Sequence, residues 1–223
     1  YHTYYWPNNA TATIIGDFNK AEALARIKNY FGEHDASKNN IPEMYTEEPE
    51  QEGPRRTVVK RAGQTGVVGV GHKTQEGLHK DTYAFQLLGK ILSEGKTSRF
   101  YKTIVDRGLA TSLLMYDFPF KDNGMFITYV FLTPDTGHQT VEDIVLEEYK
   151  KIINGGVTKE EIARAKAQTR ASVAFSRDGS YAVASALNEA IAIGDWTFYT
   201  TFMDHIEKVS TKAVSYTHLT LPT

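Results

Sequence analysis

The sequence predicts an α+β fold, in which one antiparallel sheet is covered on one face by helices. Segments rich in β-branched residues have the length of strands and are bounded by Gly, Asn and Asp. Other segments place an apolar residue at every third or fourth position over the length of a helix. Strands and helices come in pairs, in the order β-β-α-α-β-β-α-α, and paired strands favour an antiparallel sheet.

A first unit is predicted at the amino end of the chain. Residues 7–9, Pro-Asn-Asn, are typical of a turn and precede a β-branched stretch at 10–16, which we expect to be a strand. A helix is predicted over 21–30, because its apolar residues share one face and Gly32 follows as a stop.

A second unit begins near residue 56 and contains most of the predicted elements. Lys-Asp-Asn-Gly at 121–124 is a hairpin turn signal between two of its strands. Thr158 and Glu161 form a capping box that opens an Ala-rich helix. The predicted strands are 57–59, 66–71, 109–116 and 125–132, and the predicted helices are 81–92, 97–106, 140–153, 158–175, 181–193 and 196–209.

The segment between the two units reads as a linker. Residues 33–54 have no hydrophobic period and are interrupted by prolines and acidic residues. The last ten residues, VSYTHLTLPT, lack a helical period and match the translation of a transposase sequencing adapter. We therefore predict a chain truncated at both ends, with a first unit at 1–34, a linker at 35–55, a second α+β domain at 56–213 and a non-native tail at 214–223.

Composition excludes several classes of function. The chain has 223 residues, of which 41% are hydrophobic, and a net charge of -2, so a sizeable core is expected and nucleic acid is not an expected partner. Cysteine is absent, which excludes disulfides and thiolate metal sites. No apolar run reaches the length of a membrane span. The residues themselves do not fix a compartment, and a periplasmic or secreted location is our expectation.

Histidine spacing gives no metal site. The helical zinc motifs H-E-x-x-H and H-x-x-E-H are both absent. The nearest cluster is His72, Glu76 and His79, but Gly77 interrupts it, so no helical face can present all three side chains. We predict no catalytic residue and no metal ligand in this chain, and the sequence identifies no substrate-binding residue.

Glycines at 66, 69 and 71 superficially suggest a phosphate loop. They lie inside a predicted strand, and a polar loop follows instead of a helix amino terminus, so converging amides are not expected. Close packing of the backbone is the simpler explanation.

Several stretches taken together resemble one peptidase family. They are Tyr4 to Phe18 (YYWPNNATATIIGDF), Tyr30 to Gly32 (YFG), Gly95 to Tyr101 (GKTSRFY), Arg107 to Thr111 (RGLAT), Arg177 to Ser180 (RDGS) and Gly194 to Trp196 (GDW). This combination resembles the insulinase–pitrilysin family of inverted-motif zinc metallopeptidases. By that resemblance, residues 1–34 end the catalytic domain and residues 56–213 form the next domain, a processing-peptidase-like sandwich without a catalytic site.

The resemblance implies a chemistry that this chain does not carry alone. In that family two His and a distant Glu hold Zn²⁺, and the Glu of H-x-x-E-H takes a proton from metal-bound water. The matching residues would all lie before Tyr1. The resemblance also implies a peptide substrate that adds as a strand to a sheet edge. The implied partners are other domains of the same polypeptide or a paralogous subunit.

Two residues differ from those of the family's carboxy-terminal half and indicate which half the fragment resembles. In the family's carboxy-terminal half, an Arg and a Tyr seven residues later help to hold the substrate backbone. Ile104 and Thr111 stand at those positions here, and neither donates as Arg and Tyr do. This resembles the amino-terminal, zinc-bearing half.

Three functions are compatible with these features. The leading interpretation is a segment of a zinc metalloendopeptidase that supplies chamber wall and scaffold. The alternative is a non-catalytic family member that acts in peptide binding or assembly, and upstream sequence lacking H-x-x-E-H would identify it. An unrelated α+β binding module would require the combined motifs to be coincidence.

Overall fold

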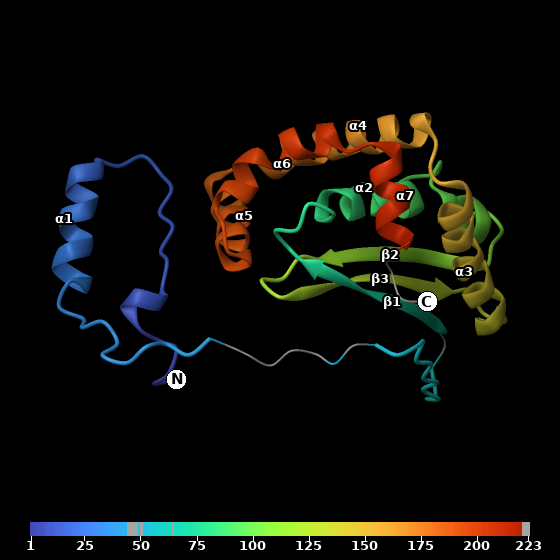
Figure 1. The fold of residues 1–223 in the computed structure, drawn as a ribbon, viewed down its shortest axis with the longest axis horizontal. Helices are drawn as coiled ribbons and strands as arrows, with labels where there is room; N and C mark the ends of the chain where they lie inside the picture. The colour runs from blue at the N-terminus through green and yellow to red at the C-terminus, as the bar shows by residue number, and fades with distance from the viewer. Residues whose placement is uncertain (44–48, 50, 64, 220–223) are drawn as a thin grey trace.

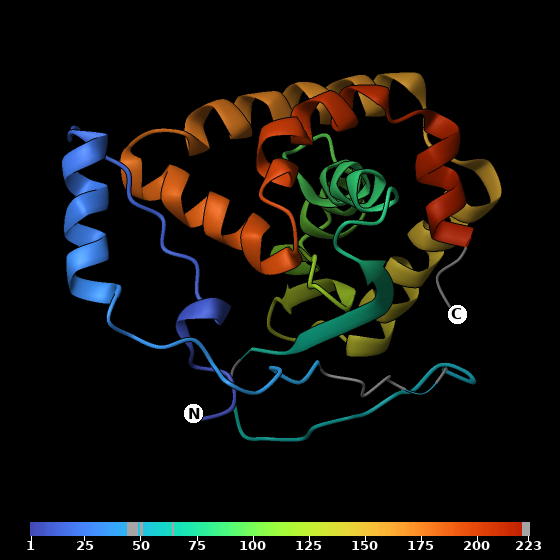
Figure 2. The same ribbon diagram turned by 60° about the vertical axis from the view of Figure 1, so that its left-hand side comes forward.

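The computed structural model describes residues 1–43, 49, 51–63 and 65–219, with side chains as far as Tyr216. A small sheet lies beneath a layer of helices, and the amino-terminal segment with α1 (Lys20–Phe31) stands to one side (Figure 1). The described residues 51–63 lie below the sheet, and Figure 2 shows the amino-terminal segment apart from the helices and sheet from a second direction. Of the described helices, none has the length and hydrophobicity to cross a bilayer.

Three antiparallel strands form the sheet. They are β1 (Val67–Glu76), β2 (Ala110–Phe118) and β3 (Asn123–Leu132), in the spatial order β1-β3-β2. Thr128 of β3 faces Val70 on one side and Met115 on the other. Strands β2 and β3 are joined by the hairpin that the Lys-Asp-Asn-Gly turn predicts. The predicted fold class, an antiparallel sheet with helices on one face, is confirmed.

The core lies between the sheet and α2 (Thr82–Ser93). Alternate residues of β3 point toward this helix, and Phe126, Thr128 and Val130 are fully buried. Helix α2 is itself covered by α4 (Lys159–Ser176) and α6 (Thr197–Lys208), so that eight of its residues are buried. The remaining helices of this unit are α3 (His138–Gly155), α5 (Ser180–Ile193) and α7 (Thr211–Leu219).

A partly buried ion pair joins three neighbouring segments. Arg99 precedes a short π-helical turn, Tyr101–Val105, and its guanidinium donates to both carboxylate oxygens of Glu161 at 2.7 Å. It also donates to the carbonyl of Gly156 at 3.1 Å. Burial alone would raise the pKa of Glu161, but the hydrogen bonds from Arg99 and the backbone of Thr158 outweigh it and lower that pKa. The predicted capping box of Thr158 and Glu161 is confirmed.

Two predicted strands are absent from the sheet. Residues 10–16 contain no strand, although Ala10 is extended at φ -124° and ψ 138°. Residues 57–59 are likewise outside the described sheet and are exposed. A β-branched composition favours extended chain, but a strand also needs a ladder partner, and composition cannot supply one. The predicted helix over 21–30 is confirmed as α1.

Helix α7 also corrects an expectation. Residues 214–219 are helical, although their pattern predicts no helix. Ser210 precedes the helix and its Oγ accepts from the N–H of Ala213 at 3.1 Å. Val214 is fully buried in the core, where α7 meets α2 and α3. Tertiary burial thus stabilises a helix that local periodicity does not indicate. Residues 220–223 lie outside the described residues, and the non-native origin of the tail stays a prediction.

Two titratable groups flank the same core residue. His72 of β1 and Asp117 of β2 both pair with Phe126 of the central strand, so both face the core in one row across the sheet. Burial lowers the pKa of His72 to about 4. Burial raises the pKa of Asp117 to about 6, although the hydrogen bond from Gln86 at 2.9 Å favours its charged form. Each group therefore resists ionisation in the folded chain.

The raised pKa of Asp117 and the lowered pKa of His72 predict opposite pH dependences. Folded Asp117 holds its proton up to about pH 6, whereas its pKa in the unfolded chain is near 3.8. Its ionisation therefore opposes folding at neutral pH, by about 3 kcal/mol. Asp117→Asn should raise the free energy of unfolding by about that amount at pH 8 and not at pH 3. His72→Gln should raise it only as the pH falls from 6.5 toward 4. Urea unfolding of each variant over this range measures both effects, and equal gains at all pH values would contradict them.

The Arg99–Glu161 pair should be a large contributor to stability. Its side chains are only 18% and 15% exposed, so Arg99→Met leaves a poorly solvated carboxylate without its main partner. We expect the free energy of unfolding to fall by roughly 3 kcal/mol. The matched control is Arg170→Met, which breaks an ion pair whose members are 61% and 43% exposed and should cost less than about 1 kcal/mol. Urea denaturation of the two variants tests the difference, and equal losses would refute it.

Candidate functional site

The face of the sheet opposite α2 is the candidate functional surface. Helices cover only the other face, so alternate residues of the three strands point away from the core. Several of these outward side chains are large and apolar, and each is between 36% and 45% exposed. They form what we call the outer face: Val67, Leu114, Tyr116, Phe118, Met125 and Tyr129.

Aromatic rings lie side by side on the outer face. Tyr116 stacks on Phe118 with ring centroids 5.5 Å apart, and the ring of Tyr129 lies edge-on at 6.4 Å from Tyr116. Beyond the strand end, Phe120 continues this row at 5.9 Å from Phe118. Such rings offer broad apolar contact at little cost in side-chain entropy.

Two glycines of β1, Gly69 and Gly71, place no side chain on this part of the outer face. Gly69 and Gly71 lie opposite Tyr129 and Ile127, and the Tyr129 ring approaches to 3.4 Å from where a Cβ of Gly69 would be. At the neighbouring strand end, a Cβ on Gly66 would meet the His138 ring at 2.7 Å. The approach at Gly66 is too close for a Cβ and is made by a side chain. A Cβ at Gly69 or Gly71 would make ordinary van der Waals contacts, so the expected close backbone packing is not seen at those two positions.

Charge is sparse on the outer face. Lys73 projects from β1 on this side, and its ammonium donates to the carbonyl of Pro49 at 3.3 Å. This contact places Pro49 of the linker beside β1. The surface can therefore hold apolar parts of a peptide, but its side chains provide no nucleophile paired with a base.

The histidine cluster is dispersed in the fold. His72 points into the core, where its ring meets the Tyr149 ring edge-on at 4.9 Å. His79 lies in the following turn, with Nδ1 3.6 Å from a carboxylate oxygen of Asp81. Glu76 ends β1 and is exposed. Within the described part of the chain, no three His, Asp or Glu side chains gather closely enough to hold a metal ion.

Ile104 and Thr111, which stand where the family's carboxy-terminal half has the Arg and Tyr that hold the substrate backbone, have structural roles. Ile104 is fully buried in the core. Thr111 lies at the start of β2, and its hydroxyl donates to the carbonyl of Phe131 at 3.2 Å. Neither side chain projects from the outer face as a free donor.

One pattern in the sequence indicates the outer face, although no site is predicted from it above. Residues 125–132, Met-Phe-Ile-Thr-Tyr-Val-Phe-Leu, are apolar at both alternating sets of positions. A strand with water on one side alternates apolar and polar residues, so this pattern indicates contact on both sides. The pattern therefore indicates an apolar second face of the sheet and does not say what covers it.

A family model matches most of the chain. Residues 1–169 match the peptidase M16 inactive domain. Zinc protease PqqE of Helicobacter pylori is 26% identical over 195 residues, which is 86% of this chain and 44% of that protein. An uncharacterized zinc protease of Streptomyces coelicolor is 24% identical, over 85% of this chain and 42% of its own length. The chain thus spans less than half the length of these relatives.

Solved structures share the fold. A protease from Helicobacter pylori superposes with a TM-score of 0.91 at 24% identity, over 98% of this chain and 54% of that chain. The inactive peptidase domain of a Bordetella parapertussis protein gives a TM-score of 0.65 at 20% identity, over 73% of this chain and 87% of that chain. The resemblance indicated by the combined motifs is confirmed: the chain belongs to the insulinase–pitrilysin family of zinc peptidases, peptidase family M16, and carries its inactive domain.

Proposed function

We propose that this chain is the non-catalytic part of a zinc metalloendopeptidase and that its outer face forms a wall of the peptide-binding chamber. The observation that carries this proposal is the exposed apolar face of a sheet whose other face is fully packed. A soluble domain rarely leaves such a surface without a partner. An unfolded peptide has the apolar side chains that would contact it.

The zinc of the parent protein is assigned to residues outside this chain. The described residues do not fit a zinc ion, because no group of three ligating side chains is present among them. In the parent, zinc would supply an activated water for peptide hydrolysis. The residues of this chain would bind and orient the peptide and would not take part in the proton transfers.

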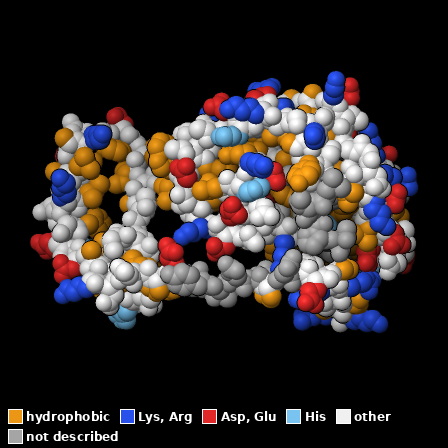
Figure 3. Space-filling view, viewed as in Figure 1, with side chains coloured by type: hydrophobic (Ala, Val, Ile, Leu, Met, Phe, Trp, Pro, Cys, Tyr) orange, Lys and Arg blue, Asp and Glu red, His pale blue; other side chains and the backbone are white. Residues whose placement is uncertain are grey.

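The amino-terminal segment supports a scaffold role. Ile14, Phe18, Leu24 and Phe31 are between 47% and 64% exposed, and no residue of α1 is buried. Hydrophobic side chains gather along α1 on the side toward the rest of the molecule (Figure 3). Near this segment, the hydroxyl of Thr13 donates to Asn188 at 2.6 Å. We assign the apolar surface to packing against the catalytic domain of the parent.

A partner subunit without zinc is the second candidate. The chain matches 85 residues of the mitochondrial-processing peptidase subunit beta of Saccharomyces cerevisiae at 31% identity. It also shares a fold with a chain of complex III from Candida albicans, with a TM-score of 0.75 over 92% of this chain. These similarities make an assembly role reasonable, and the presence or absence of H-x-x-E-H in the parent distinguishes the two candidates.

The isolated chain should be inert, whereas its parent should cleave peptides. Because the chain offers no zinc ligands or general base among its described residues, it should retain no stoichiometric zinc and hydrolyse no unstructured peptide. The parent should retain zinc and lose activity with a chelator. Metal analysis and a fluorogenic peptide assay on both proteins test this. Chelator-sensitive cleavage by the isolated chain would refute the assignment, and a zinc-free, inactive parent would favour the partner subunit.

Substitution on the outer face should weaken peptide binding in the parent. Leu114→Lys places a charge among the aromatic rings, so KM for an apolar peptide should rise about tenfold with kcat nearly unchanged. The control is Leu146→Lys, since Leu146 of α3 is exposed to a similar extent, 37% against 43%. Steady-state kinetics of both variants measure the effect. An equal response of both variants would remove the outer face from the binding surface.

A further inference from the structure

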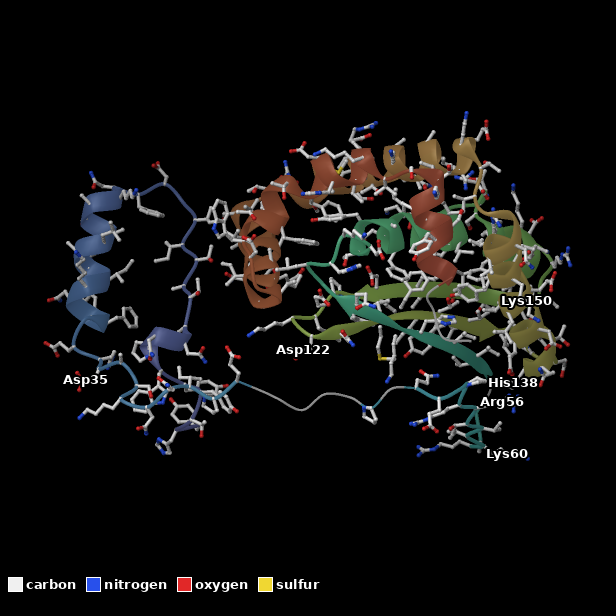
Figure 4. All side chains as sticks on the ribbon, viewed as in Figure 1. Asp35, Arg56, Lys60, Asp122, His138 and Lys150 are labelled. Atoms are coloured by element: carbon white, nitrogen blue, oxygen red, sulfur yellow. The ribbon has the colours of Figure 1, made fainter. Side chains whose placement is uncertain are left out.

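The end of the linker is extended and open to solvent. Residues 54–63 contain no helix or strand, and every one of them is exposed. Val58 and Val59 are 60% and 74% exposed, although their side chains are apolar. Figure 4 shows Lys60 at the outer end of this segment, below Arg56 and away from the sheet.

Two pairs of basic residues lie in this segment, and they differ in their contacts. In the first pair, the guanidinium of Arg56 donates to both carboxylate oxygens of Glu142 at 2.9 to 3.2 Å and to Gln139 at 3.3 Å. In the second pair, Lys60 and Arg61 form no hydrogen bond or ion pair with any residue that the structure describes. Arg56 is therefore restrained by Glu142, whereas Lys60 and Arg61 are free.

Endopeptidases bind their substrates as extended strands, so a site within a folded element must first open. Residues 58–63 require no such opening. Arg61 supplies a cation for a carboxylate-bearing specificity pocket, and Ala62 and Gly63 follow it with little bulk.

We propose that residues 58–63 are a processing site for an endopeptidase that cuts after basic residues, with the Arg61–Ala62 bond as the bond cleaved. The reaction is a hydrolysis in which the peptide C–N bond breaks. Water adds its oxygen to the carbonyl carbon of Arg61, and the amide nitrogen of Ala62 takes a proton. The products are a carboxylate at Arg61 and an ammonium group at Ala62.

The position of this bond determines what cleavage releases. Every buried residue of the described chain lies at or after Val68. Cleavage after Arg61 therefore removes the first unit and the linker and leaves the whole core in the carboxy-terminal product. The structure of the inactive peptidase domain of a Bordetella parapertussis protein was solved on its own, and it matches 73% of this chain.

Limited digestion of the full chain with trypsin tests the proposal. Intact mass spectrometry at short times should show first cleavage after Lys60 or Arg61, before any cut after Arg56, Lys38 or Lys121. The double variant Lys60→Gln/Arg61→Gln should abolish cleavage within residues 58–63, so that the first cut moves to another exposed basic residue such as Arg55 or Lys38. First cleavage at another position in the wild-type chain would overturn the proposal.

The difference between the two basic pairs has its own control. Glu142→Gln releases Arg56 and should increase cleavage after Arg56 by about two- to five-fold, the range expected for an exposed ion pair. Glu207→Gln breaks the Arg170 pair on the helical layer and should change neither rate. Equal cleavage after Arg56 and Arg61 in the wild-type chain would contradict the restraint assigned to Glu142.

Discussion

Helix α2 is packed on both sides, and the other elements of the second unit are arranged around it. Its lower side rests on the inner residues of the sheet, and its upper side is covered by α4 and α6. Leu87, Leu88 and Ile91 are fully buried as a result. A helix that is apolar nearly all round can exist in water only as the middle layer of a sandwich. This requirement explains why every covering helix lies on one side of the sheet.

Because the helices of the second unit all pack on the inner face of the sheet, they leave the outer face exposed. The rings of Tyr116 and Tyr129 make that face apolar, and the glycines of β1 keep it open. A packed core and an exposed apolar face are thus the two sides of the same three strands. The relatives named as zinc proteases are about twice the length of this chain, so they contain further domains beside the one matched here.

Local signals in the sequence predicted most of the second unit. The capping box at Thr158, the turn before β3 and the periodicity of α2 depend on neighbouring residues, and each was found where expected. The misplaced elements depend on distant partners. Residues 10–16 and 57–59 have strand composition without a ladder, and Val214 is held in α7 by core burial. The outer face is not predicted as a site, because the sequence of a strand with two apolar faces is the same whether its second face contacts a helix or a ligand.

The position of the buried residues determines how many residues unfold as one cooperative unit. Since burial in the described chain starts at Val68, heat and denaturant act on a cooperative unit of about 150 residues, smaller than the length of the chain. The calorimetric enthalpy, the heat-capacity increment and the denaturant m-value should all scale with that smaller unit. The amino-terminal residues would add mass to the molecule while contributing almost nothing to its melting transition.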